Sequence, residues 1–206
     1  MPDYVVKQIL ADPASIKLGG VNQTVTVLFA DIRGFTRMSE HTSPERVVHL
    51  LNRYFTTMSE IILKHGGTVD KYIGDGLMAL FGAPQATPDD AAGAISAAVE
   101  MQAAMAQVNA DLRGAGLAEV SIGIGLHTGE ATVGYIGSER RSEYTAIGDT
   151  VNVSARLETH AKPGEILLSQ ETRNAAGDLP YVFVPREPIR VKNRETPIKI
   201  FEVERA

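Results

Sequence analysis

The sequence predicts an α+β protein with a ferredoxin-like βαββαβ core and additions that follow this core towards the C-terminus. Two long segments carry the apolar spacing of helices, and short runs of β-branched and apolar residues stand between and beside them. Their order is strand, helix, strand, strand, helix, strand. Glycine and proline stand at the junctions, where the chain has to turn. This order gives an antiparallel sheet with helices packed on one face.

The first strand and the first long helix are read from the N-terminal third. Residues 24–32 read TVTVLFADI, a β-branched and apolar run typical of a buried strand. Ser43 and Pro44 mark a helix start, because proline suits the first helical position. Apolar residues then recur every three or four positions until Gly66 and Gly67, which end the helix.

A hairpin and a second helix come next. Residues 68–72 and 77–81 are predicted as short strands, joined by a tight turn in which Asp75 has a glycine on each side. Residues 88–112 form a long alanine-rich helix that Gly114 closes.

The additions to this core are one more helix and several short strands. We expect strands at residues 120–126 and 130–136 and a helix over residues 150–159. Further short strands are expected near residues 166–168, 181–184, 189–191 and 198–203.

The N-terminal residues 1–20 are predicted to lie outside the main domain. Apolar residues up to Leu10 have helical spacing, Pro13 interrupts them, and a glycine pair separates them from the first strand. The segment is either a connector from an upstream domain or a short helix packed on this one. The domain itself is expected to comprise residues 21–206.

Composition excludes several classes of protein. The chain of 206 residues has 44% hydrophobic and 22% charged residues, which suits one globular domain with a core. No apolar run approaches the ~18 residues of a membrane span. The net charge of −5 gives no support for a nucleic-acid partner. Cysteine is absent, which excludes disulfides and fits a reducing compartment, so we expect a cytoplasmic location.

Two aspartates are candidates for a metal site. Asp31 ends the first strand, and Asp75 is at the tip of the hairpin that neighbours this strand in a ferredoxin-like sheet. Carboxylates at adjacent strand ends can share hard cations such as Mg²⁺. Taken alone, both residues are also ordinary turn aspartates. The five histidines lack the paired spacing of a metal site.

Three motifs decide between these alternatives. Residues 27–36 read VLFADIRGFT, residues 71–76 read KYIGDG, and residues 144–156 read YTAIGDTVNVSAR. In order and spacing these segments resemble the signatures of the class III adenylate and guanylate cyclases. The resemblance extends from about residue 24 to residue 203.

The resemblance implies a two-metal mechanism. In this family the residues that match Asp31 and Asp75 bind two divalent cations, Mg²⁺ or Mn²⁺, which polarise the α-phosphate and help to deprotonate the attacking ribose 3′-hydroxyl. The matching residues to Asn152 and Arg156 orient the ribose and stabilise the transferring phosphate, and both lie on one face of the predicted helix. Lys192 matches the lysine that holds the β- and γ-phosphates, although Asn193 stands where glycine is common.

The resemblance also implies which base is recognised. Lys71 and Thr145 match the two residues that read the base, and lysine is the adenylate type where guanylate cyclases usually have glutamate. Many adenylate cyclases have aspartate at the second position. Threonine resembles a subgroup that includes bicarbonate-responsive members, so regulation by bicarbonate is expected. Because a hydroxyl both donates and accepts, we expect it to discriminate less strictly than a carboxylate.

The family forms each active site between two protomers, so the resemblance implies a homodimer with ATP as its substrate. An upstream regulatory domain is expected to control it. Residues 134–144, rich in charge and glycine, are either an arm that crosses to the partner or a plain exposed hairpin.

Two other functions compete with an adenylate cyclase. Lys71 argues against a guanylate cyclase. A non-catalytic cyclase-like domain that only dimerises or regulates should lack a metal aspartate or the asparagine–arginine pair, and all are present here. A diguanylate cyclase needs a GGDEF-like hairpin, which this chain does not have.

Overall fold

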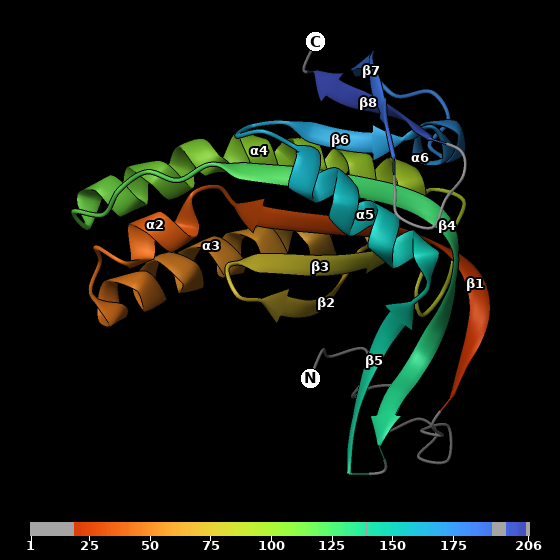
Figure 1. Ribbon diagram of the computed structural model, residues 1–206, viewed down its shortest axis with the longest axis horizontal. Helices are drawn as coiled ribbons and strands as arrows, with labels where there is room; N and C mark the ends of the chain where they lie inside the picture. The colour runs from red at the N-terminus through yellow and green to blue at the C-terminus, as the bar shows by residue number, and fades with distance from the viewer. Residues whose placement is uncertain (1–18, 139, 191–196, 205–206) are drawn as a thin grey trace.

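A computed structural model describes residues 19–138, 140–190 and 197–204 (Figure 1). Their strands form one mixed sheet of eight strands in the order β2-β3-β1-β4-β6-β8-β7, with β5 paired to β4. The strands are β1 (Gly19–Ile32), β2 (Thr68–Ile73), β3 (Gly76–Phe81), β4 (Ile122–Ser138), β5 (Arg141–Ile147), β6 (Ile166–Ser169), β7 (Val182–Ile189) and β8 (Ile198–Glu204). The helices are α2 (Phe35–Ser39), α3 (Pro44–Lys64), α4 (Asp90–Gly114), α5 (Asp149–His160) and α6 (Gln170–Ala175).

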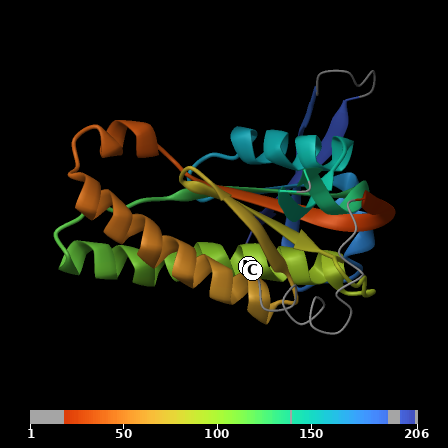
Figure 2. The ribbon, with the colours of Figure 1, turned by 90° about the horizontal axis from the view of Figure 1, so that it is seen from below.

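The predicted α+β class and ferredoxin-like core are confirmed. β1, α3, β2, β3, α4 and β4 follow one another in the expected order, and β1 lies antiparallel between β3 and β4. Helices α3 and α4 cover one face of the sheet, and α5 covers the other (Figures 1 and 2). The main core lies under α3 and α4, where Leu28, Tyr54 and Ile95 are fully buried.

One long strand replaces the two that we predicted at residues 120–126 and 130–136. The glycines of β4 do not break the strand. They leave room for α5 to pack closely against it. A side chain at Gly125 would meet the backbone nitrogen of Glu158 on α5, and one at Gly129 would lie 2.8 Å from the Thr150 hydroxyl. These glycines let α5 approach the sheet closely.

The first strand extends further towards the N-terminus than the predicted range, which started at residue 24. β1 begins at Gly19 because this residue and Gly20 pair with Tyr135 and Gly134 of β4. Residues 1–18 lie outside the described residues, so the division into a connector and a domain stays a prediction.

The segment predicted as an arm or a hairpin is a β-hairpin. β4 and β5 pair in register from Thr132 opposite Ile147 to Ser138 opposite Arg141. The hairpin extends away from the rest of the molecule in Figure 1.

The C-terminal part also differs from the expectation. The strands predicted near residues 181–184 and 189–191 are one strand, β7, in which the register shifts between Arg186 and Ile189. α2, β5 and α6 were not predicted. None of the helices in the described ranges is long and apolar enough to cross a membrane.

Candidate active site

The structure brings Asp31 and Asp75 together at one end of the sheet. Asp31 lies at the end of β1, and Asp75 occupies the turn between β2 and β3, which pairs with β1. A Cβ atom at Gly76 would lie only 2.8 Å from Oδ1 of Asp31. A residue without a side chain is therefore needed beside Asp75. The two carboxyl groups are close enough for each to influence the pKa of the other.

The electrostatics of this carboxyl pair are unfavourable without a counter-charge. Burial is the largest cause that raises the pKa of Asp75 to about 6, and the negative charge of Asp31 adds to it. Burial also raises the pKa of Asp31, although the neighbouring Arg33 opposes this. Two carboxylates that repel each other in a partly buried place are stabilised by a cation.

The donor set of this place fits a hard divalent cation. Both groups supply carboxylate oxygens, the ligands that Mg²⁺ prefers, and the Asp31 side chain stays 35% exposed. Within residues 19–138, 140–190 and 197–204, no group of three His, Asp or Glu side chains could complete a metal site. Backbone carbonyls, water or substrate phosphate would therefore have to supply the remaining ligands.

A partly buried ion pair connects the carboxyl pair to α5. Nη1 of Arg33 lies 2.6 Å from Oε1 of Glu158 and 3.6 Å from Oδ2 of Asp31. The same guanidinium donates to the backbone carbonyl of Glu158. The end of β1 is thus held against the C-terminal half of α5, the helix that carries the candidate transition-state residues.

Lys71 and Thr145 come together through a residue that sequence reasoning missed. The Thr145 hydroxyl donates to Oδ2 of Asp70 at 2.5 Å, and Nζ of Lys71 lies 3.6 Å from Oδ1 of Asp70. Nζ of Lys71 also donates to Oε2 of Glu143 at 3.0 Å. Asp70 stands directly before Lys71, and a charged residue in a strand was the only sequence signal that could have found it.

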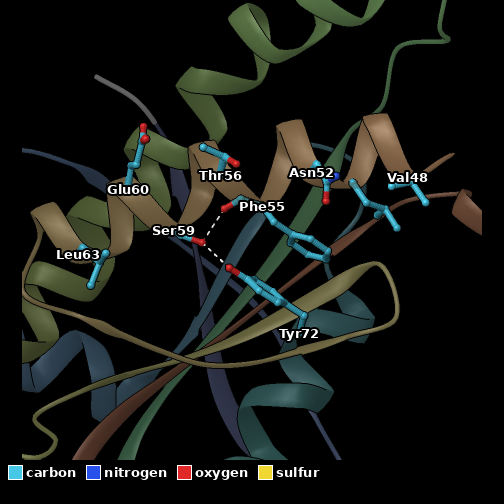
Figure 3. Close-up of a pocket in the computed structure, with 9 residues that line it drawn as sticks. Val48, Asn52, Phe55, Thr56, Ser59, Glu60, Leu63 and Tyr72 are labelled. Atoms are coloured by element: carbon cyan, nitrogen blue, oxygen red, sulfur yellow. Dashed lines mark hydrogen bonds between the residues drawn. The ribbon is translucent and has the colours of Figure 1, made fainter. Parts of the chain in front are cut away.

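The strand that carries Lys71 is also fixed to α3 (Figure 3). The hydroxyl groups of Tyr72 and Ser59 are 2.8 Å apart, and the ring centroids of Tyr72 and Phe55 are 4.2 Å apart. These contacts border a groove of about 590 Å³ that is lined largely by α3. Glu60 is its one ionisable lining residue besides Tyr72, so the groove lacks the paired groups that catalysis would require.

Asn152 and Arg156 lie on the exposed face of α5. The opposite face is buried, and the Ser154 hydroxyl donates to the Val27 carbonyl at 2.7 Å. One face of α5 therefore holds the helix on the sheet while Asn152 and Arg156 project from it. Lys192, with Asn193 and Arg194, lies outside the described residues.

Comparisons with known proteins agree with this arrangement. Residues 20–204 match the family model described as the adenylate and guanylate cyclase catalytic domain. Adenylate cyclase 1 of Rhizobium meliloti (strain 1021) is 38% identical over 182 residues, which are 88% of this chain and 27% of that protein. An adenylate cyclase of Anabaena cylindrica is 37% identical over 203 residues, covering 92% of this chain and 38% of that protein. This chain thus spans well under half the length of either relative.

Two crystal structures are similar in both fold and sequence. The guanylyl cyclase Cya2 superposes with a TM-score of 0.87 at 42% identity, covering 90% of this chain and 94% of that one. The adenylyl cyclase CyaB from P. aeruginosa superposes with a TM-score of 0.87 at 38% identity, covering 92% of this chain and 97% of that one.

Proposed function

The chain belongs to the family of adenylate and guanylate cyclase catalytic domains, and on this premise we propose that it converts ATP to 3′,5′-cyclic AMP and pyrophosphate. The observation that carries the proposal is the adjacent pair of Asp31 and Asp75 carboxyls at the strand ends. Divalent cations bound there, Mg²⁺ or Mn²⁺, would supply Lewis acidity at the phosphates.

The protein side chains bind and orient the nucleotide. In this proposal the ribose 3′-hydroxyl gives its proton to solvent water and its oxygen attacks the α-phosphorus, while the bond from that phosphorus to pyrophosphate breaks. Asn152 orients the ribose, and the guanidinium of Arg156 stabilises the charge on the transferring phosphate. Lys192 holds the β- and γ-phosphates.

Lys71 supports ATP as the substrate. An ammonium group only donates hydrogen bonds, so it suits N1 of adenine, which accepts, and opposes N1 of guanine, which carries a hydrogen. A guanylate cyclase is the second candidate, favoured by the similarity to the guanylyl cyclase Cya2.

A product assay tests the choice between these two activities. The protein is incubated with ATP or GTP and with Mg²⁺, Mn²⁺ or EDTA, and the cyclic nucleotides are quantified. We expect cyclic AMP with either metal and none with EDTA. Formation of cyclic GMP at a kcat/KM comparable to that for ATP would contradict the preference for ATP and leave cyclase chemistry standing. No cyclic product from either nucleotide would favour a non-catalytic regulatory domain.

We also propose a homodimer whose active sites are shared. Asp31 and Asp75 of one protomer would face Lys71, Thr145, Asn152, Arg156 and Lys192 of the other. The projecting β4–β5 hairpin supports this, because it leaves Ile147 51% exposed and the neighbouring Val21 64% exposed. Large apolar side chains on an extended hairpin are suited to an interface.

Mixing two inactive variants tests the shared site. Asp31→Ala and Arg156→Ala should each be inactive, but their heterodimer has one site with both lesions and one with neither. With free exchange of subunits, about a quarter of the wild-type activity should return, because half of the dimers each hold one intact site. If subunit exchange is measured and no activity returns, each site lies within one chain.

Regulation and location complete the proposal. Thr145 and the resemblance to bicarbonate-responsive members motivate stimulation by bicarbonate, which should raise kcat when titrated at fixed pH and ionic strength. A flat response would remove bicarbonate from the proposal. We also propose that an upstream domain controls the catalytic domain of residues 21–206 and that residues 1–20 connect the two. The proposed location is cytoplasmic.

A further inference from the structure

Asp70 lies between the two residues that we assign to the base, and nothing in its sequence context gave it a role. We propose that Asp70 is a positioning residue that makes Thr145 a hydrogen-bond acceptor towards the base, so that the pair selects adenine. This inference rests on the proposed function, because it assumes that a purine meets Lys71 and Thr145.

The backbone is distorted at Asp70 in a way that aims its side chain. In the β2–β3 ladder Val69 pairs with Ala79 and Lys71 pairs with Met78, so Asp70 is an extra residue without a partner across the ladder. Such β-bulges redirect a side chain and occur often beside active sites. Here the carboxylate reaches Thr145 of β5, a strand that pairs with β4 and not with β2.

Contacts within the protomer hold the Asp70 carboxylate in place. The Asp70 side chain is completely buried. Its Oδ2 accepts a hydrogen bond from the Thr145 hydroxyl, whereas its Oδ1 has no hydrogen-bond partner among the described residues. The ammonium group of Lys71 is 3.6 Å away and balances its charge. A buried carboxylate without these partners would be costly, so its contacts hold β2 and β5 together.

The direction of the hydrogen bond between Thr145 and Asp70 decides which groups of a base Thr145 can recognise. An ionised carboxylate only accepts, so the hydroxyl must donate its single hydrogen to Asp70. The lone pairs of the hydroxyl oxygen remain, and towards a ligand Thr145 can then only accept. We expected a hydroxyl to be less strict than a carboxylate at this position. With its hydrogen committed to Asp70, it offers the base the same acceptor that an aspartate would.

The resulting pattern matches adenine and opposes guanine. The exocyclic N6 amine of adenine donates a hydrogen bond, whereas O6 of guanine at the corresponding place accepts one. Thr145 as an acceptor pairs with the amine and repels the carbonyl oxygen. Lys71 remains a donor beside it, which suits the adjacent N1 of adenine.

Three variants test this inference: Asp70→Asn, Thr145→Val and the double variant. An asparagine keeps the size but can donate to the Thr145 oxygen, which frees the hydroxyl to donate to guanine. Affinities for 3′-deoxy-ATP and 3′-deoxy-GTP, which lack the attacking hydroxyl, are measured with Mg²⁺ together with kcat/KM for ATP and GTP. We expect each single variant to reduce the ATP:GTP ratio of kcat/KM, and the matching ratio of affinities, by about tenfold. This is the effect expected from the loss of one hydrogen bond to the base.

The double variant separates positioning from a structural role. If Asp70 acts through the Thr145 hydroxyl, Asp70→Asn should not change the ratio further once that hydroxyl is gone. Two matched controls should keep the wild-type ratio. Asp111→Asn removes a carboxylate that pairs with Arg53 on α3, and Thr57→Val removes a hydroxyl that donates to the Arg53 carbonyl.

The outcomes distinguish this inference from the proposed function. Equal losses for ATP and GTP in Asp70→Asn, or a further change of ratio in the double variant, would overturn the inference and leave cyclase activity standing. Shifted affinity ratios in a protein that forms no cyclic nucleotide would support the inference and reject the proposed function. Failure of the wild type to bind either deoxynucleotide would overturn both. The thermal midpoint of each variant shows whether a loss of affinity or activity results from unfolding. Thr145→Val removes the contact between Asp70 and Thr145 while Asp70 stays intact.

Discussion

The β2–β3 hairpin carries two aspartates that are at least partly buried, and the charges beside them differ in sign. Asp70, in the bulge of β2, is buried, accepts a hydrogen bond from the Thr145 hydroxyl and has the ammonium group of Lys71 3.6 Å away. Asp75, in the turn, lies against the carboxyl group of Asp31. The protomer gives Asp70 a hydrogen-bond donor and a nearby positive charge, whereas it gives Asp75 mainly a like charge.

The difference indicates which carboxylates serve the structure and which await a ligand. A carboxylate that has a hydrogen-bond donor and a nearby positive charge holds these neighbours in one geometry. Two carboxylates held together without a cation store repulsion that binding of a metal relieves, so the site costs stability in its empty form. Breaking each region should therefore change different properties of the protein.

The largest effect is expected at the carboxyl pair. Asp75→Asn and Asp31→Asn should each reduce cyclase turnover by on the order of 10³-fold or more, because each removes a ligand of the proposed metal site. The same substitutions should raise the thermal midpoint in EDTA at neutral pH, since the repulsion disappears. Turnover is measured as cyclic AMP formation, and the midpoint by calorimetry.

Asp111→Asn is the matched control for this prediction. Asp111 is an ion-paired aspartate of α4, and its pKa is lowered by hydrogen bonds from Gln107 and Arg53 and by the charge of Arg53. Its substitution should leave turnover unchanged and should not raise the midpoint. Wild-type turnover in Asp75→Asn would contradict the metal assignment, and a lowered midpoint would contradict the stored repulsion.

A smaller effect is expected at the base-reading pair. Lys71→Glu replaces a donor by an acceptor beside Asp70, so kcat/KM for ATP should fall by about 10²-fold while cyclase chemistry persists. Lys64→Glu, which breaks an exposed ion pair with Glu100 on α4, is the control and should keep the wild-type value. An unchanged kcat/KM in Lys71→Glu would remove this residue from base recognition.

The sequence predicted the core of the fold well because local signals coincide with the elements. Pro44 begins α3, and a left-handed Gly66 directly follows its end, as expected from the chemistry of these two residues. The prediction failed where packing decides. We predicted separate strands at residues 120–126 and 130–136, although residues 127–129 lie within β4, where a side chain at Gly129 would collide with Thr150 of α5.

The candidate site could be predicted only in part. Asp31 and Asp75 stand at strand ends, so their proximity follows from the order of the strands in a ferredoxin-like sheet. The contact of Asp70 with Thr145 could not be predicted in this way. It depends on a register shift in β2 and on the position of β5, both of which are consequences of tertiary packing.

The smallest expected effect is a change in how stability depends on pH. Burial raises the pKa of Asp70 above its ordinary 3.8, against the opposing hydrogen bond from Thr145 and the charge of Lys71. The folded state therefore holds this proton at a higher pH than the unfolded state does. The stability that protonated Asp70 contributes is complete below pH 3.8 and is lost as the pH rises through the folded pKa.

Asp70→Asn does not titrate, so its thermal midpoint relative to the wild type should rise as the pH increases from 3.8 upward and then level off. Asp111→Asn should behave in the opposite sense. Because the pKa of Asp111 is lowered, the wild type holds its advantage over that variant at neutral pH and loses it as the pH falls. Both differences are measured by calorimetry between pH 3.5 and 8 in EDTA, with Asp31 and Asp75 unchanged in all three proteins, so their titration cancels. A midpoint difference for Asp70→Asn that is flat, or that falls with pH, would mean that the Thr145 and Lys71 contacts outweigh the burial of this carboxylate.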